Sequence, residues 1–68
     1  MLSIALNLKN AREKQGMTQA EVAAKVGITQ AACVKFEKGI RIPNAVTLKA
    51  IADALEVPVG SLYEEFEE

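Results

Sequence analysis

The sequence of 68 residues contains no histidine, no tryptophan and a single cysteine, Cys33. One cysteine cannot build a disulfide framework, and without histidine there is neither a His/Cys zinc site nor a cysteine–histidine catalytic pair. The chain shows no pairing of a nucleophile with a base and no metal-binding cluster. We therefore expect a protein that is not an enzyme, with no cofactor, no metal and no recognisable small-molecule ligand.

The sequence also lacks a long hydrophobic segment. No apolar run approaches the roughly 20 residues that a transmembrane helix needs. The first residues, Met1–Leu8, lack the basic flank and the length of a signal peptide. These absences lead us to expect a cytoplasmic protein with no membrane partner.

What the chain does contain is typical of one small globular domain. Half of its residues are hydrophobic and a quarter are charged, which is globular rather than disordered composition. A second domain would need roughly 50 residues of its own. We therefore predict a single domain over residues 1–68.

The charges are unevenly distributed. The net charge is −1, but residues 1–55 hold all eight cations and four acids, whereas residues 56–68 hold five acids and no cation. Exposed charges more than about 10 Å apart are largely screened from each other. The basic part of the chain, residues 1–55, can thus bind nucleic acid although residues 56–68, which include the acidic end at residues 64–68, bring the net charge of the whole chain below zero. We interpret that end as a frayed, solubilising helix end, with repulsion from DNA as the alternative.

Glycines and capping residues divide the chain into helices. Gly16, Gly27 and Gly39 stand where helices should end, because glycine adopts the left-handed conformation of a helix end at little cost. The expected helices before them cover Asn7–Gln15, Gln19–Val26 and Gln30–Lys38. Helix starts are indicated by a capping box from Thr18 to Glu21, by Thr29 and Asn44 as caps, and by Pro58 before a short fifth helix.

The spacing of apolar residues agrees with this division and predicts the core. Apolar residues recur three and four positions apart, as one face of a helix requires. The predicted core comprises Ile4, Leu8, Ala11, Val22, Ala23, Val26, Cys33, Phe36, Leu48, Ile51, Ala52, Leu55, Leu62 and Phe66. Alternation typical of strands is missing, although Met1–Leu6 could pair as a short edge strand instead of extending the first helix. The prediction is an all-α fold of five helices, each 7–13 residues long.

The most informative stretch is residues 18–38, where two short helices are separated by a turn of about four residues that contains Gly27. Such a turn is too short for an antiparallel hairpin, so the helices must cross steeply, as in a helix-turn-helix. The second helix buries Cys33 and Phe36 and presents Gln30, Ala31, Val34 and Lys35 outward. A face of small residues flanked by Gln and Lys can enter a DNA major groove.

With these residues in view, the sequence resembles the lambda-repressor-like (xenobiotic-response-element, phage Cro-like) helix-turn-helix regulators over most of its length. The matching residues are Leu8-Lys9, Arg12-Glu13, Gly16-Met17-Thr18-Gln19, Val22-Ala23, Val26-Gly27-Ile28-Thr29-Gln30, Phe36-Glu37-Lys38-Gly39, Pro43 and Leu48 through Val57. The resemblance implies a compact five-helix DNA-binding domain. It also implies a transcriptional regulator that binds operator DNA as a dimer.

Carried over residue by residue, the resemblance implies a DNA-binding set in and around the third helix. It assigns Gln30 to adenine recognition, and a bidentate Gln–adenine pair discriminates by about 1–3 kcal/mol. Gln19 would bond a phosphate and brace Gln30. The whole set is Gln19, Thr29, Gln30, Ala31, Val34, Lys35, Lys38 and Arg41.

Within that set, Ala31 can touch a thymine methyl group, and Lys35 can reach a base edge or a phosphate. Lys38 and Arg41 lie beyond the base-reading residues and resemble backbone contacts that set register without reading sequence. Arg12 and Glu37 match a family pair that ties the first helix to the third, which implies a structural role.

The function hypothesis is a sequence-specific repressor that binds an inverted-repeat operator as a homodimer through the major groove. Part of the apolar surface of Val57, Val59, Tyr63 and Phe66 is expected to form the two-fold contact. The alternative is a helix-turn-helix module that binds a protein, such as an antirepressor or antitoxin partner, because Ala31, Ala32 and Val34 leave few polar base readers. A DNA-binding domain within a longer polypeptide is a third possibility. Cys33 is expected to be a buried small side chain.

Overall fold

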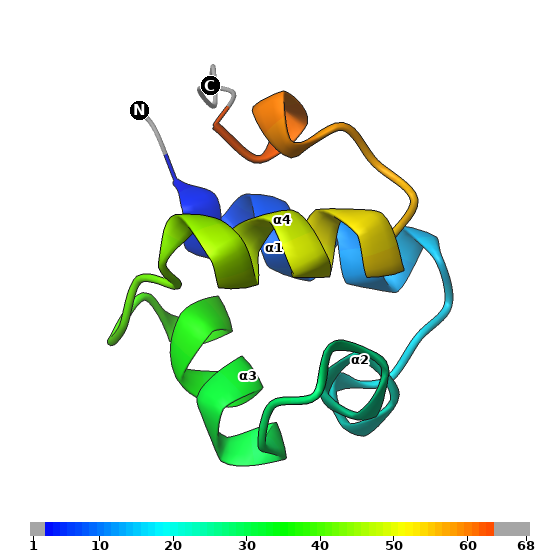
Figure 1. Ribbon diagram of the computed structural model, residues 1–68, viewed down its shortest axis with the longest axis vertical. Helices are drawn as coiled ribbons and strands as arrows, with labels where there is room; N and C mark the ends of the chain where they lie inside the picture. The colour runs from blue at the N-terminus through cyan, green and yellow to red at the C-terminus, as the bar shows by residue number, and fades with distance from the viewer. Residues whose placement is uncertain (1–2, 64–68) are drawn as a thin grey trace.

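The computed structural model describes residues 3–63 as four α-helices followed by one short 3₁₀ helix. Their bounds are α1 (Ile4–Lys14), α2 (Gln19–Val26), α3 (Gln30–Lys38), α4 (Ala45–Ala54) and η1 (Val59–Tyr63) (Figure 1). Residues 3–63 contain no strand, so the predicted all-α class is confirmed for this part of the chain. No helix in the same part is long and apolar enough to cross a membrane.

Each α-helix begins at a side-chain cap. Thr18, Thr29 and Asn44 accept hydrogen bonds from backbone N–H groups three residues further on, as predicted. The sequence reasoning missed Ser3, whose hydroxyl accepts from the Leu6 N–H at 3.2 Å. Because of this cap, α1 begins three residues before the expected Asn7. The edge-strand alternative is therefore wrong for residues 3–6, and the first two residues lie outside the described part.

The helix ends show one feature that the glycine pattern did not predict. Gly16, Gly27 and Gly39 have positive φ angles, which confirms their expected role. After α4 the left-handed position is occupied by Glu56, with φ 59°. A side chain in this conformation costs roughly 1–2 kcal/mol. The surrounding chain holds it there, since the Val57 N–H donates to the Ala52 carbonyl at 3.0 Å.

The fifth helix differs from the prediction in type and length. It is a 3₁₀ helix of five residues, shorter than the 7–13 expected. The Ser61 N–H donates to the Pro58 carbonyl at 3.0 Å, and the Ser61 hydroxyl donates to the same oxygen at 2.7 Å. This i→i+3 pattern suits short connecting pieces and poorly supports longer ones. With Gly60 as its second residue, the segment gains little from α-helical propensity.

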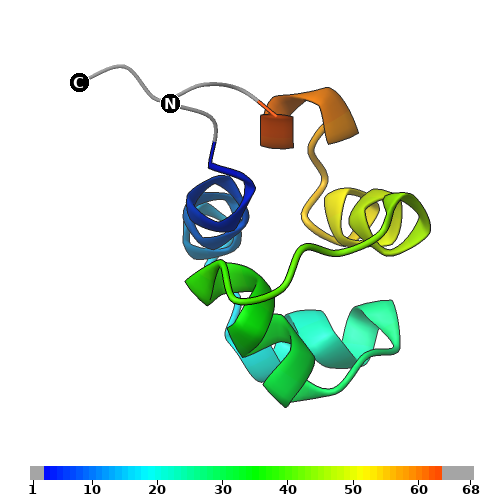
Figure 2. The same ribbon diagram turned by 90° about the vertical axis from the view of Figure 1, so that its left-hand side faces the viewer.

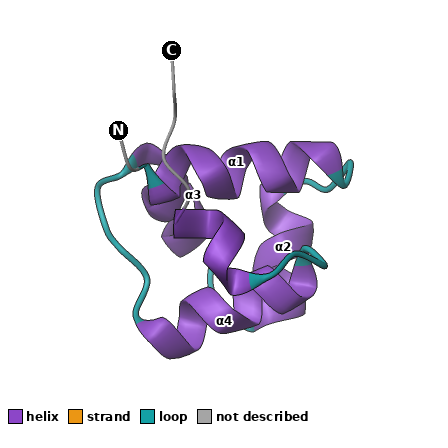
Figure 3. Cartoon of the chain, turned by 90° about the horizontal axis from the view of Figure 1, so that it is seen from above, coloured by secondary structure: helices purple, strands orange, loops and turns teal. Residues whose placement is uncertain are grey.

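The core lies where the five elements meet. Figures 2 and 3 show α1 and α4 as two rods with η1 and α3 on opposite sides of them, and α2 beside α3. The buried core contains Leu8, Val22, Ala23, Cys33, Phe36, Leu48, Ile51, Ala52, Leu55 and Leu62, with Ile4, Ala11 and Val26 packed against it. This agrees with the predicted core wherever it is described. Phe66 and the acidic end at residues 64–68 lie outside the described residues.

Candidate nucleic-acid interface

The steep crossing predicted for residues 18–38 is present. Figure 1 shows α2 almost end-on while α3 runs across the view. The turn between them is closed by the N–H groups of Gly27 and Ile28, which both donate to the Ala23 carbonyl, at 2.9 and 3.0 Å. Ile28 packs its side chain against the core. The turn thus fixes the angle at which α3 projects from the molecule.

The predicted DNA-binding set divides into exposed and half-buried residues. Six of the eight are exposed, namely Thr29, Gln30, Ala31, Lys35, Lys38 and Arg41. Val34 and Gln19 are half-buried. The Thr29 hydroxyl also caps α3 by accepting from the Ala32 N–H at 3.1 Å. One element, α3 with its flanks, therefore carries every member of the set except Gln19.

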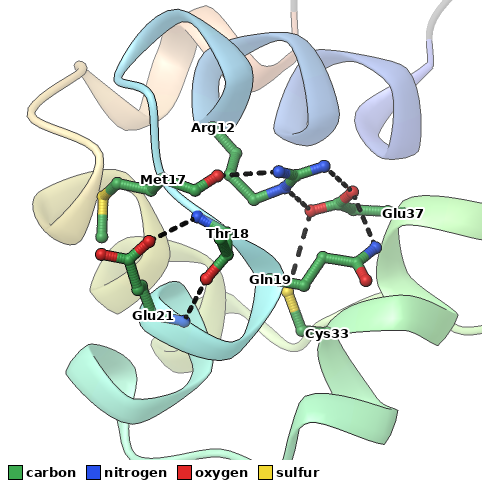
Figure 4. Close-up of polar contacts among 7 residues, drawn as sticks. All are labelled: Arg12, Met17, Thr18, Gln19, Glu21, Cys33 and Glu37. Carbon is green, nitrogen blue, oxygen red and sulfur yellow. Dashed lines mark hydrogen bonds and ion pairs between the residues drawn. The ribbon is translucent and has the colours of Figure 1, made fainter.

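Gln19 opens α2 and is tied to α3 by a hydrogen bond. Its side-chain amide Nε2 donates to Glu37 Oε1 at 3.2 Å (Figure 4). The resemblance implied that Gln19 braces Gln30, but the described hydrogen bonds of residues 3–63 place its bond on Glu37. The start of α2 is thereby held at a fixed position relative to α3.

Glu37 is the centre of a polar network beneath this surface. It accepts from Arg12 Nε at 2.7 Å and from Arg12 Nη2 at 3.0 Å, while Arg12 Nη1 donates to the Met17 carbonyl at 2.8 Å (Figure 4). The two side chains are only 13% and 6% exposed. The hydrogen bond to Glu37 raises the pKa of Arg12. This geometry confirms that Arg12 and Glu37 pair, and it joins α1, α2 and α3.

Cys33 lies beside Glu37 and is buried, so its thiol does not belong to the exposed face of α3. It is 4% exposed, and its thiol donates to Glu37 Oε2 at 3.8 Å. Burial raises the pKa of Cys33, and the nearby Glu37 raises it further. A thiol in such surroundings stays protonated and unreactive. The prediction of a buried small side chain is confirmed.

Arg41 is held by an aromatic ring. Its guanidinium carbon lies 5.9 Å from the centroid of Phe36, within the range of a cation–π interaction. Arg41 follows α3 in the loop that leads to α4. The ring orients an exposed cation beside the end of α3.

The residues expected at the two-fold contact differ in exposure. Val57 and Val59 are half-buried and pack against the core, and Tyr63 is 45% exposed. The largest exposures are instead at Ile40 (69%), Ile42 (73%) and Val46 (82%). Sequence reasoning missed these exposed residues, although the run Ile40–Pro43 between two helices was a visible signal.

A steeply crossed helix pair whose second helix presents small, polar and cationic side chains defines a helix-turn-helix domain. The chain matches the helix-turn-helix family over residues 8–62. That match covers most of the chain, and the protein belongs to this family.

Three relatives support the assignment. The chain is 36% identical over 61 residues to the cryptic phage CTXphi transcriptional repressor RstR of Vibrio cholerae, covering 90% of this chain and 54% of that protein. It is 39% identical over 56 residues to the uncharacterized HTH-type transcriptional regulator YqaE of Bacillus subtilis, covering 82% and 48%. It is 37% identical over 54 residues to the uncharacterized HTH-type transcriptional regulator y4dJ of Sinorhizobium fredii, covering 79% and 70%. The chain thus spans about half the length of the first two.

Among solved structures, the fold is similar to the N-terminal DNA binding domain of SinR from Bacillus subtilis. The TM-score is 0.85 at 26% sequence identity, and the match covers 96% of each chain. The arrangement of four α-helices and a terminal 3₁₀ helix is therefore compatible with a fold that occurs in a DNA-binding domain.

Proposed function

We propose that this protein is a DNA-binding transcriptional regulator that represses a promoter by occupying an inverted-repeat operator as a homodimer. The observation that carries the proposal is the outer face of α3. Gln30, Ala31 and Lys35 are exposed there, on a helix held to α1 and α2 by the buried Glu37 network. Support also comes from the names of RstR, a transcriptional repressor, and of the SinR DNA binding domain.

In the proposed complex the N-terminal part of α3 lies in the major groove, where recognition helices contact base edges. Gln30 reads adenine, Ala31 contacts a thymine methyl group and Lys35 reaches a base edge or a phosphate. Val34 and Thr29 complete the surface at the groove. The side-chain amide nitrogen of Gln19 carries two N–H groups. One donates to Glu37, and in the proposed complex the other donates to a phosphate oxygen.

Contacts to the DNA backbone would come from the cations after the base-reading residues. Lys38 ends α3, and Arg41 is oriented by Phe36 in the following loop. Such contacts position a protein on the duplex without reading its sequence. Two copies would place their α3 helices in successive major grooves, about 34 Å apart. Operator occupancy would then exclude RNA polymerase by steric hindrance.

The test is selection of bound sequences from a random duplex library at about 100 mM salt, where phosphate contacts still contribute to binding. We expect an inverted repeat with an adenine in each half-site. The variant Gln30→Ala should lose the preference for that adenine by about 10- to 100-fold, equivalent to roughly 1–3 kcal/mol. Its α-helical circular dichroism should match that of the parent.

One control variant and two alternative outcomes make the selection decisive. Lys49→Ala removes an exposed cation on α4 and should select the same operator as the parent. A single half-site would contradict the dimer and keep DNA binding. No enrichment with a folded protein would contradict DNA binding and favour the alternative, a module that binds a protein partner.

A further inference from the structure

The side-chain amide of Gln19 is held by a carboxylate that is itself fixed. Gln19 Nε2 donates to Glu37 Oε1 at 3.2 Å (Figure 4). The Glu37 side chain is 6% exposed and accepts from Arg12 Nε at 2.7 Å and from Arg12 Nη2 at 3.0 Å. The thiol of Cys33, one turn earlier on α3, donates to Glu37 Oε2 at 3.8 Å. Both carboxylate oxygens are thus held from α1 and α3, and Glu37 can orient the Gln19 amide.

The chemistry of the carboxylate decides which way the amide faces. A carboxylate accepts hydrogen bonds and cannot donate them, so the amide turns its nitrogen and not its oxygen toward Glu37. The nitrogen carries two N–H groups in the plane of the amide. With one of them bonded to Glu37 Oε1, the direction of the other is fixed as well. Glu37 therefore orients a second donor on Gln19, at the first residue of α2.

The charge beside Gln19 is balanced. A lone carboxylate beneath a DNA-binding surface would repel phosphate groups, because like charges oppose each other strongly at short distance. Arg12 bonds both oxygens of Glu37, and its Nη1 donates to the Met17 carbonyl at 2.8 Å. Such two-pronged pairs of guanidinium and carboxylate fix the geometry as well as the charge. Glu37 can thus hold an amide at this place without repelling an anion.

The three glutamines of the chain differ in burial. Gln15 and Gln30 are exposed, whereas Gln19 is half-buried. A long side chain that becomes immobile only on binding weakens that binding by a factor of about 2 to 10. A side chain that is held before binding avoids most of this loss. The bond to Glu37 therefore favours a contact made by Gln19.

We infer that Glu37 is a positioning residue for DNA binding, which fixes the Gln19 amide in the free protein so that its second N–H donates to a phosphate oxygen. This inference rests on the proposed function and goes beyond it, because the resemblance implies only a structural role for Glu37. Arg12 acts one step further back, by holding and neutralising Glu37. The contact positions the start of α2 on the DNA backbone and reads no sequence.

The orientation of Gln19 is tested without DNA by nuclear magnetic resonance, from the nitrogen-15 relaxation of the glutamine side-chain amides in the whole chain. We expect the Gln19 amide to be rigid and the exposed amides of Gln15 and Gln30 to be mobile on the picosecond-to-nanosecond timescale. Equal mobility of the three would overturn the inference. On addition of operator DNA, Gln30 should become rigid and Gln19 should change little. A Gln19 amide that becomes rigid only with DNA would also overturn it.

The positioning role is tested by the operator affinities of Gln19→Ala, Glu37→Gln and the double variant, measured at one salt concentration. Gln19→Ala should weaken binding about 10-fold, as expected for a hydrogen bond to a charged group. Glu37→Gln provides one acceptor oxygen where the carboxylate provides two, so it should release the Gln19 amide and weaken binding about 2- to 10-fold. The loss of a negative charge alone would instead tighten binding to DNA. Tighter binding of Glu37→Gln would therefore overturn the inference.

The double variant separates positioning from a purely structural role. When Gln19→Ala is already present, Glu37→Gln has no amide to release, so it should leave the affinity unchanged or raise it slightly. A purely structural role of Glu37 would weaken binding by the same factor in both backgrounds, and this result would overturn the inference. The matched control is Asp53→Asn, which removes an acid from an exposed pair on α4. It should leave the affinity unchanged in both backgrounds.

Circular dichroism shows whether each variant is folded before the affinities are compared. If Glu37→Gln does not fold, the relaxation of the Gln19 amide in the free and the DNA-bound parent decides the inference by itself. If the parent binds no DNA, the proposed function fails. The relaxation of the free protein then still shows whether Glu37 holds the Gln19 amide, so the two failures are distinguishable.

Discussion

At the scale of single residues, Glu37 joins more of the molecule than any other charged side chain in residues 3–63. It accepts hydrogen bonds from Arg12 on α1 and Gln19 on α2, and it belongs to α3. Buried ion pairs contribute little net stability compared with apolar replacements, because both charges must be desolvated. Removing only one partner of a buried ion pair lowers the stability strongly, because the other charge stays buried without a counter-charge. The value of Glu37 is thus that it holds three helices in one arrangement.

Replacing Glu37 by Gln should lower the free energy of unfolding by about 3 kcal/mol or more, since Arg12 would stay buried without a counter-charge. Urea denaturation followed by circular dichroism measures this loss. The matched control is Asp53→Asn, which removes an acid from the pair with Lys49, whose side chains are 62% and 64% exposed. That change should cost less than about 1 kcal/mol. Equal effects of the two variants would show that the buried pair has no special importance.

At the scale of secondary-structure elements, α2 depends on its N-terminal cap more than longer helices would. It has eight residues, and helices this short are marginal on their own. Thr18 and Glu21 exchange hydrogen bonds with each other's backbone, at 3.1 Å from the Glu21 N–H and 2.9 Å from the Thr18 N–H. The backbone bond from Thr18 lowers the pKa of Glu21. The cap is therefore sensitive to acid.

The lowered pKa predicts a pH dependence with a definite sign. The folded protein binds the Glu21 proton less readily than the unfolded chain, so this contribution to stability is present above the ordinary glutamate pKa. It is lost as the pH falls through the lower, folded value. Glu21→Gln keeps the side chain of a capping box without a titrating group. We expect its unfolding free energy to fall less than that of the parent between pH 5 and pH 3, in denaturation series measured at matched pH values.

The other carboxylates titrate in both proteins, so the difference between the two curves isolates Glu21. Parallel curves over the whole range would contradict the assignment. A loss for the parent at high pH instead would contradict its sign.

At the scale of the whole molecule, the proposed function makes the division of charge along the chain bear on DNA binding. All eight cations lie in residues 1–55 and five of the nine acids lie beyond them. Lys35 and Lys38 occupy α3, whereas Lys49 lies on α4, a separate helix that Figure 1 shows above α3 and in front of α1. Under the proposed function, only cations near α3 neutralise phosphates.

The effect of replacing a lysine on the salt dependence of DNA binding should therefore depend on whether that lysine lies on α3 or on α4. Each neutralised phosphate contributes a slope of about −0.9 in log affinity against log salt. Lys38→Gln should reduce the slope by about that amount and weaken binding to all sequences alike. Lys49→Gln should leave it unchanged. Fluorescence anisotropy over a salt series measures both, and equal slopes for the two variants would contradict the placement of Lys38 at the DNA backbone.

Much of the fold could be predicted because its signals are local. Thr18, Thr29 and Asn44 cap their helices through bonds that span three residues, and the glycine ends at 16, 27 and 39 depend on one backbone conformation each. The 3₁₀ form of η1 was not predictable in the same way. Its five residues provide too short a pattern of apolar positions to distinguish a 3₁₀ helix from an α-helix, and the segment packs against both α1 and α4.

The candidate site was only partly predictable. The exposed face of α3 follows from helical periodicity once Cys33 and Phe36 are assigned to the core. The orientation of Arg41 over Phe36 and the exposure of Ile40 and Ile42 depend on the path of a loop. No periodicity governs that path.

The amino-acid sequence by itself determined the caps of α2, α3 and α4, the buried faces of the α-helices and the residues that α3 presents, because these follow from interactions within one or two turns. The tertiary structure alone decided which partner Gln19 binds and where η1 meets α1. These features join residues 18 and 55 positions apart. Contacts over such separations depend on how whole helices pack, and local sequence does not contain that information.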